Sequence, residues 1–189
     1  LSALVVGYLV GILLGVLAAS YQGSIIDQLV RVVSVIGNAI PAFWLGLILI
    51  IVFSVNLDIL PMGGMRDIAS SGGFDLMERL RHLALPVGVL SLSIIANISR
   101  YTRTSMLEVI GQDYVRTAQA KGLSSRMITW RHVIRNALLP VATFLGPALG
   151  GLLGGAVIVE QVFSWPGMGR LVVDSVFTRD YPIVMGAVV

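Results

Sequence analysis

The sequence predicts an all-α protein, a polytopic bundle of transmembrane helices. Of its 189 residues, 56% are hydrophobic and only 12% are charged, whereas an average soluble domain carries about 25% charged residues. Several long stretches contain no charged side chain at all, and the basic residues gather in one segment. A soluble enzyme or nucleic-acid-binding module is excluded, because too few polar groups remain to cover its surface.

Stretches without charge mark the expected spans. About 20 apolar helical residues cross a bilayer core of about 30 Å, and a charge at a helix centre costs about 2.5–3.5 kcal/mol on insertion scales. A soluble helical protein would instead show amphipathic periodicity. Because the sequence opens and closes within apolar runs, we expect it to be a fragment with at least one further span before it. The expected spans are four complete ones and the start of a fifth, approximately residues 1–20, 32–55, 83–104, 136–159 and 181–189.

The basic residues orient these spans. Seven of the 13 Lys and Arg residues lie in residues 100–135, together with only two acids. The positive-inside rule places this segment in the cytoplasm, so residues 105–135 form a cytoplasmic segment and residues 56–82 and 160–180 form outer loops. Topology accounts for the basic cluster, so we expect contact with lipid headgroups and no binding of nucleic acid.

The cytoplasmic segment is expected to contain two short helices around a turn. Asp113 is a suitable N-cap for a helix that runs to Lys121. Gly122 fits the left-handed position that ends a helix, and Ser124 or Ser125 can cap the next one. A short capped helix between two spans is either a docking element or an ordered loop.

Two stretches of the sequence resemble one family of transporters. The first is DYVRTAQAKGL at residues 113–123 with WRHVIRNALLP at 130–140, and the second is GGAVIVEQVFSWPGMGRL at 154–171 with RDYP at 179–182. These stretches resemble the permeases of ABC-type importers, more narrowly the first (B-type) permease subunit of dipeptide, oligopeptide and nickel importers. Together they cover about a quarter of the chain.

The general importer motif is only partly kept. The second alanine, the glycine and the closing Leu-Pro pair are present, at Ala118, Gly122 and residues 139–140. Arg116 and Thr117 replace its Glu-Ala, and the spacing after the glycine is longer. These departures are similar to those of the peptide-transporter branch.

The resemblance implies roles for two groups of residues. The first group would form the coupling helix, seated on a cytoplasmic ATPase: Tyr114, Arg116, Thr117, Ala118, Lys121, Gly122, Leu123 and Ser124. The second group, Phe163, Trp165 and Gly167, would help form an outer gate that faces an external substrate-binding protein. A simple interfacial anchor is the alternative for the second group, because aromatic residues gather at membrane boundaries.

The energy source is expected to lie outside this chain. No phosphate-binding Gly-x-x-x-x-Gly-Lys-Ser/Thr motif is present, so we expect no catalytic residue and no cofactor here, with ATP and Mg bound by partner subunits. His82 and His132 are isolated in the sequence, and we expect no metal site.

The spans carry few polar groups. Asn38 and Asn97 are the best candidates to line a pathway, because unsatisfied amides are costly in hydrocarbon; hydrogen bonding between helices is the alternative. Prolines at 41, 140 and 147 should kink or weaken their helices.

We therefore expect a multi-pass permease of a prokaryotic cell membrane, most consistent with peptide import. Its partners would be a second homologous permease, two cytoplasmic ATPase subunits, an external substrate-binding protein and membrane lipid. Uptake of nickel or glutathione is the alternative within the family. From another class, the alternative is an ion-coupled secondary transporter or channel, which the lack of ionisable residues at mid-span disfavours.

Overall fold

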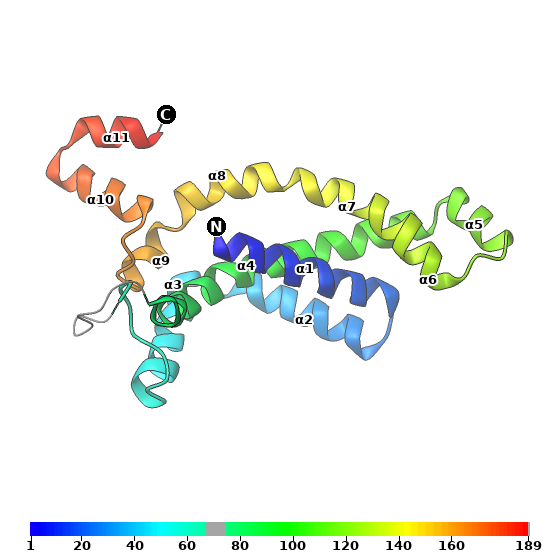
Figure 1. The fold of residues 1–189 in the computed structure, drawn as a ribbon, viewed down its shortest axis with the longest axis horizontal. Helices are drawn as coiled ribbons and strands as arrows, with labels where there is room; N and C mark the ends of the chain where they lie inside the picture. The colour runs from blue at the N-terminus through cyan, green and yellow to red at the C-terminus, as the bar shows by residue number, and fades with distance from the viewer. Residues whose placement is uncertain (67–74, 189) are drawn as a thin grey trace. The chain divides into compact units, whose positions relative to one another are not determined.

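The computed structural model describes residues 1–66 and 75–188, and over these residues it is helical, without strands. The predicted all-α fold class is therefore confirmed. Figure 1 shows the order of the elements. The helices are α1 (Ser2–Ser20), α2 (Ile25–Ala39), α3 (Ala42–Leu49), η1 (Ile50–Asn56), α4 (Leu76–Ile110), α5 (Asp113–Ala120), α6 (Ser125–Ile128), η2 (Thr129–Val133), α7 (Ile134–Thr143), α8 (Leu145–Gly155), α9 (Val157–Val162), α10 (Met168–Thr178) and α11 (Tyr181–Val188), where η1 and η2 are π-helical turns.

The helices group into two compact units. The first unit comprises residues 1–3, 40–91 and 149–189, and the second comprises residues 4–39 and 92–148. Each unit has its own cluster of buried apolar side chains.

Three helices of the described chain are long and apolar enough to cross a membrane: Ser2–Ser20, Leu76–Ile110 and the continuous stretch Ser125–Gly151. The expected span 32–55 is interrupted, because α2 ends at Ala39 and α3 begins at Ala42. Pro41 between them is extended (ψ 132°), and a proline disfavours helical geometry in the residue before it. Taken together, α2 and the α3–η1 stretch make a fourth candidate span.

The helix bounds differ from the expected span and loop bounds in three places. Helix α4 already begins at Leu76, inside the expected outer loop 56–82, of which residues 67–74 lie outside the described part. Helix α4 also continues to Ile110, into the expected cytoplasmic segment, and α10 occupies Met168–Thr178 within the expected loop 160–180. Charged side chains end the apolar runs at these places, and the expected spans end there too. A helix can continue through such residues, because Glu, Lys and Arg are good helix formers.

The expected span 136–159 is also not one regular helix. Helix α7 ends at Thr143 and α8 ends at Gly155. The ring of Pro147 would clash with the carbonyl four residues earlier, which belongs to Thr143. The first of these breaks follows from that proline.

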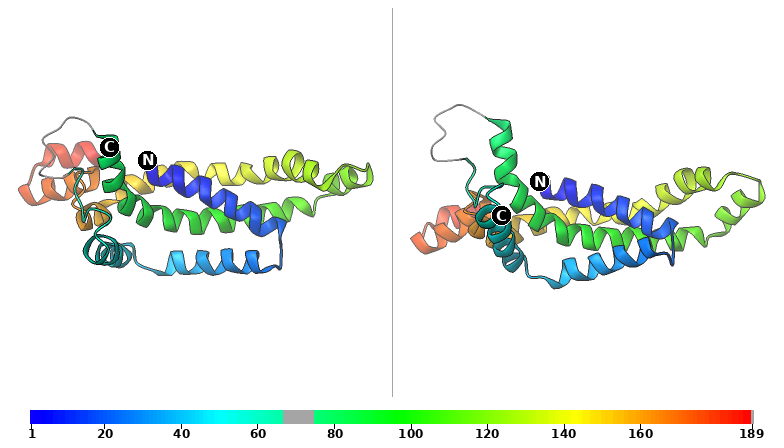
Figure 2. Two further views of the ribbon diagram at one scale, coloured as in Figure 1. Left: turned by 60° about the horizontal axis from the view of Figure 1, so that its bottom comes forward. Right: turned by 90° about the horizontal axis from the view of Figure 1, so that it is seen from below.

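In the second unit, α4 lies between α1 and α2, as Figures 1 and 2 show. Gly7, Gly11 and Gly15 of α1 face Ile94, Ile98 and Thr102 of α4. A Cβ on Gly15 would lie 2.5 Å from the Thr102 Cβ and 2.7 Å from the Ser99 carbonyl oxygen. The spacing of four residues puts these small residues on one helix face and allows close packing.

We expect Gly15→Ala to destabilise the second unit by about 1–3 kcal/mol, the usual cost of overpacking. The measurement is the midpoint of thermal unfolding of the purified protein in detergent. Gly88→Ala is the matched control, because a Cβ on Gly88 of α4 would meet no described atom within 4 Å. It should gain up to about 1 kcal/mol from helix propensity. Equal midpoints for the two variants would contradict the packing argument.

The core of the first unit forms around Phe163, which is 1% exposed. Its ring packs with Leu85 and Val89 of α4 and Val159 of α9. A Cβ on Gly46 of α3 would lie 3.2 Å from the same ring, so the absent side chain at Gly46 makes room for it. This packing holds the segment after α9 against α3 and α4.

Candidate functional site

The cytoplasmic segment is built around α5, which is amphipathic. Val115 and Ala118 of α5 are 1% and 7% exposed. They pack in the core of the second unit with Ala19 of α1, Met106 of α4 and Ile128 of α6. Two buried anchors on one face therefore fix α5 to the bundle and leave its other face exposed.

The end of α5 is a Schellman motif. The Gly122 N–H donates to the Gln119 carbonyl at 2.9 Å, and the Leu123 N–H donates to the Ala118 carbonyl at 3.3 Å. Gly122 is left-handed (φ +79°), as this motif requires. The sequence prediction for Gly122 is confirmed. The Ser124 hydroxyl accepts from the Met127 N–H at 3.4 Å, so Ser124, rather than Ser125, caps α6.

The predicted cap at the start of α5 is wrong. The helix begins at Asp113, and the residue in the extended N-cap position is Gln112. Asp113 instead pairs with Arg116 at 3.5 Å, and both side chains are well exposed. Its position in the first turn still complements the positive end of the helix dipole.

Seven of the eight residues expected to contact an ATPase are exposed, and Ala118 is not. Ala118 lies on the anchoring face, so its contribution is to seat α5. Tyr114 is linked back to the bundle, because its hydroxyl accepts from the Asn136 side chain at 3.1 Å. The residues that lie outward are Tyr114, Arg116, Thr117, Lys121, Gly122, Leu123 and Ser124.

Three residues of this region were missed from sequence. Val115 is its most buried anchor, and Met127 and Trp130 are large apolar side chains that are 47% and 63% exposed. The spacing of Val115 and Ala118 by three residues was the available signal for an anchoring face. Together with Tyr114 and Leu123, Met127 and Trp130 give the segment exposed apolar side chains.

The two asparagines expected along a pathway are brought together by α2 and α4. Asn38 Nδ2 donates to Asn97 Oδ1 at 3.3 Å. Each amide also donates to the carbonyl four residues earlier on its own helix. The alternative for this pair, a hydrogen bond between helices, is therefore present. A role of the two asparagines in the pathway stays a prediction.

The three residues expected at an outer gate occupy different environments. Phe163 is in the core of the first unit, so the alternative of a simple interfacial anchor does not fit it, and its role at an outer gate stays a prediction. Trp165 is half-buried, and Gly167 lies against Glu160, whose carboxylate a Cβ on Gly167 would overlap. Gly63 also approaches this segment closely, and the Gly64 N–H donates to the Phe163 carbonyl at 2.8 Å.

Glu160 holds this outer segment together, and sequence reasoning missed it. Its Oε2 accepts from the Arg170 N–H at 2.8 Å, which satisfies one of the free donors in the first turn of α10. Its carbonyl accepts from the Trp165 N–H at 2.7 Å. The available signal was an acid directly after the apolar run 136–159, followed by the small residues Gly167 and Gly169.

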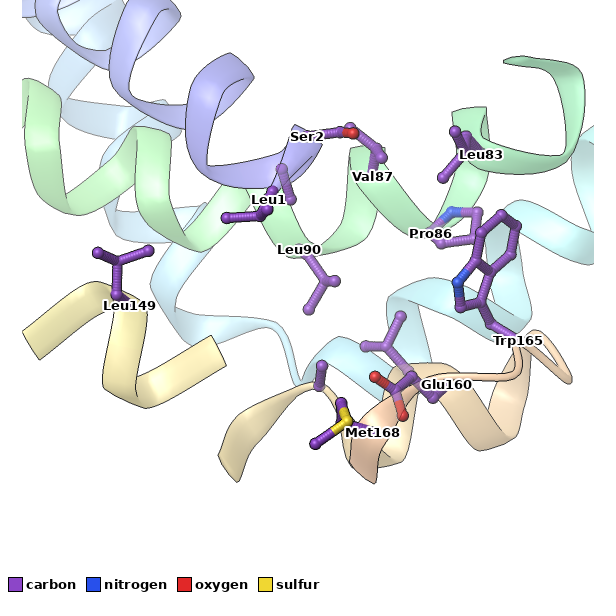
Figure 3. A pocket seen from close by; sticks show the side chains of 13 residues that line it. Leu1, Ser2, Leu83, Pro86, Val87, Leu90, Leu149, Glu160, Trp165 and Met168 are labelled. Carbon is purple, nitrogen blue, oxygen red and sulfur yellow. The ribbon is translucent and has the colours of Figure 1, made fainter. Parts of the chain in front are cut away.

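A cavity of about 310 Å³ lies beside Glu160 in the first unit. Figure 3 shows Glu160, Trp165 and Met168 on one side of it and Pro86 and Leu90 of α4 on another. Its lining is mainly apolar, and among the described side chains that line it only Glu160 is charged.

We expect Glu160→Ala to loosen the start of α10. Loss of a helix-capping carboxylate costs about 1 kcal/mol, which corresponds to about fivefold more of the locally opened form. Trypsin cleavage at Arg170 in the folded protein should accelerate accordingly. Gln161→Ala, at the exposed neighbouring position, is the control. Unchanged cleavage in Glu160→Ala would show that the bond to Arg170 does not hold α10.

Comparison with known proteins agrees with the resemblance seen in the sequence. Residues 11–189 match the family described as binding-protein-dependent transport system inner membrane component. The chain is 46% identical over 185 residues to the oligopeptide transport system permease protein AppB of Bacillus subtilis (strain 168), covering 98% of this chain and 58% of that protein. It is 45% identical over 194 residues to the di/tripeptide transport system permease protein DppB of Pseudomonas aeruginosa (strain UCBPP-PA14), covering 94% and 58%.

A third relative is the dipeptide transport system permease protein DppB of Escherichia coli (strain K12), 40% identical over 205 residues and covering 98% of this chain and 60% of that protein. The chain therefore spans about three fifths of the length of these relatives. The match to the family model covers nearly all of the chain, and the apolar helices are those of a multi-pass membrane protein. The chain belongs to the family of inner membrane components of binding-protein-dependent transport systems, the permeases of ABC-type importers.

Proposed function

We propose that this chain is part of the permease subunit of an ATP-driven peptide importer. The observation that carries the proposal is the match of residues 11–189 to an importer permease family, combined with relatives named for oligopeptide, di/tripeptide and dipeptide transport. Those names favour peptides over nickel or glutathione as cargo. Membership of a binding-protein-dependent family also disfavours an ion-coupled transporter or channel.

The cytoplasmic segment supports a mechanical role for this chain. Helix α5 is held by Val115 and Ala118, and its outer face is polar or aromatic. Such a short anchored helix can transmit movement of a bound ATPase to α4 and α7, because it is packed on the bundle and ends in a defined turn. ATP and Mg would be bound by two partner ATPase subunits, and this chain would catalyse no covalent step.

Membership of the family supports a proposal for the remaining partners. A second, homologous permease subunit would complete the pathway, and an external binding protein would deliver the peptide to the outer segment around Trp165 and Gly167. Asn38 and Asn97 would line the pathway, where their amides can exchange one hydrogen bond for another as a polar cargo passes.

The test is uptake of a labelled dipeptide and a labelled tripeptide into proteoliposomes that contain both permeases and the ATPases, with the binding protein outside. We expect uptake that needs ATP and the binding protein. Uptake driven by an ion gradient without the ATPases would overturn the importer assignment. ATP-driven uptake of nickel or glutathione in place of peptides would overturn the cargo.

A further inference from the structure

A basic crevice lies between α2 and α4 in the second unit, and the family assignment does not account for it. Its volume is about 190 Å³. Three arginines from two helices line it, Arg31, Arg100 and Arg103. The rest of its lining is Val30, Ser34, Val35, Ser99 and Thr104.

One of these arginines is already neutralised. Arg103 makes a two-pronged ion pair with Asp27, with Nε to Oδ1 at 2.6 Å and Nη2 to Oδ2 at 2.9 Å. Asp27 is 1% exposed and also accepts from the Gly23 N–H at 3.0 Å. Its carboxylate is therefore committed to these partners.

The other two arginines retain donors that a ligand could use. Arg31 Nε lies 3.6 Å from Asp27 Oδ1 and its side chain is 55% exposed, a distance too long for a hydrogen bond. Arg100 Nη2 donates one long bond, 3.4 Å, to the neutral Asn97 Oδ1. Three guanidinium groups against one carboxylate leave the crevice with two net positive charges, so it is suited to an anion.

The surroundings of the crevice are apolar on the side of α2. A second hollow shares Arg31 and Val35 with the crevice and continues along Val32 and Ile36. Val32, Val35 and Ile36 are 53%, 69% and 48% exposed. An anion bound at Arg31 and Arg100 would therefore have hydrocarbon surface beside it. An acyl chain would cover that surface, whereas a free phosphate would leave it exposed.

The position along the chain agrees with a lipid. Arg31 directly precedes the charge-free run 32–57, and Arg100 directly follows the charge-free run 83–99. With the predicted topology, both arginines lie at the cytoplasmic boundary of the membrane, at the level of the phosphate groups. Basic pockets between helices on this side are suited to anionic headgroups.

We propose that Arg31 and Arg100 form a binding site for one anionic phospholipid of the inner leaflet, with its phosphate between α2 and α4 and an acyl chain along Val32, Val35 and Ile36. The Ser34 and Ser99 hydroxyls, 2.9 Å apart, join α2 to α4 beside it, so that a bound lipid would bridge the same two helices.

The experiment measures phosphatidylglycerol retained by the purified, assembled transporter, by native mass spectrometry after exchange into mixed phosphatidylglycerol and phosphatidylcholine. The wild type should retain phosphatidylglycerol in preference to phosphatidylcholine. The double variant R31Q/R100Q should bind it about 25-fold more weakly, since each basic side chain near an anionic surface contributes about fivefold. The ion pair of Asp27 with Arg103 stays intact in this variant.

The matched control is R131Q/R135Q, which removes two exposed charges from the same expected side of the membrane. It should retain the lipid like the wild type. Equal losses in both double variants would overturn the site in favour of general attraction of charge. Displacement of the lipid by inorganic phosphate or by a peptide carboxylate at comparable concentration would overturn the lipid assignment. Circular dichroism and size-exclusion profiles that match the wild type establish that a loss comes from the site.

Discussion

We expect Gly122→Val to reduce ATP-driven peptide uptake more than about tenfold while the protein still inserts in the membrane. Gly122 is left-handed (φ +79°), a conformation that is a genuine outlier for a β-branched residue. Relief of the strain, about 1–3 kcal/mol at such positions, would undo the two hydrogen bonds that end α5. The measurement is initial uptake, normalised to the amount of protein in the membrane fraction.

Two controls separate coupling from general strain. Gly23 has nearly the same backbone (φ +78°), and a Cβ there would meet no described atom within 4 Å, as at Gly122. Gly23→Val therefore introduces the same strain in the turn between α1 and α2 and should keep most of the uptake. Gly122→Asn should also keep it, because Asn tolerates this conformation. Normal uptake by Gly122→Val, or equal losses at Gly23 and Gly122, would contradict a coupling role for α5.

The cytoplasmic segment was largely predictable because its signals are local. A glycine after an eight-residue helical pattern and a serine before the next helix each act through neighbouring backbone groups, and Gly122 and Ser124 do so in the structure. The error at Asp113 has the same local origin. Residue preference favours Asp at the N-cap, but the helix already includes Asp113, a shift of one residue that is within the usual range for helix ends.

The tertiary contacts could not be predicted in the same way. Phe163 looked like a membrane-boundary aromatic, but Gly46 and Gly63, more than 95 residues earlier in the sequence, provide the space that buries it. Gly7, Gly11 and Gly15 recur at intervals of four residues in the sequence, but nothing local identifies α4 as their partner. The prolines predicted helix breaks only in part. Pro41 lies at a break between helices and Pro147 in the first turn after one, whereas Pro140 lies inside α7.

The ion pair of Asp27 with Arg103 joins residues 76 positions apart, and we expect it to be the largest single electrostatic contribution to the second unit. Asp27→Asn leaves the Arg103 guanidinium, with a side chain only 20% exposed, without its counter-charge. Breaking a buried pair costs about 3–5 kcal/mol, and the partial exposure of Arg103 favours the lower value. The measurement is the free energy of unfolding of the purified protein in detergent, by denaturant titration.

Two further variants test that the cost comes from an uncompensated charge. Asp113→Asn breaks the exposed pair with Arg116 and should change the free energy of unfolding by less than about 1 kcal/mol, as for other surface pairs.

The double variant Asp27→Leu with Arg103→Met removes both charges and replaces them by apolar side chains. It should recover much of the stability lost in Asp27→Asn, because neither charge is then left buried. If the double variant is no more stable than Asp27→Asn, the Asp27 carboxylate contributes through the hydrogen bond that it accepts from the Gly23 N–H rather than through charge. If Asp27→Asn is as stable as the wild type, the pair does not hold α2 against α4. The contact between Ser34 and Ser99 and the burial of Val30 would then be what holds the two helices together.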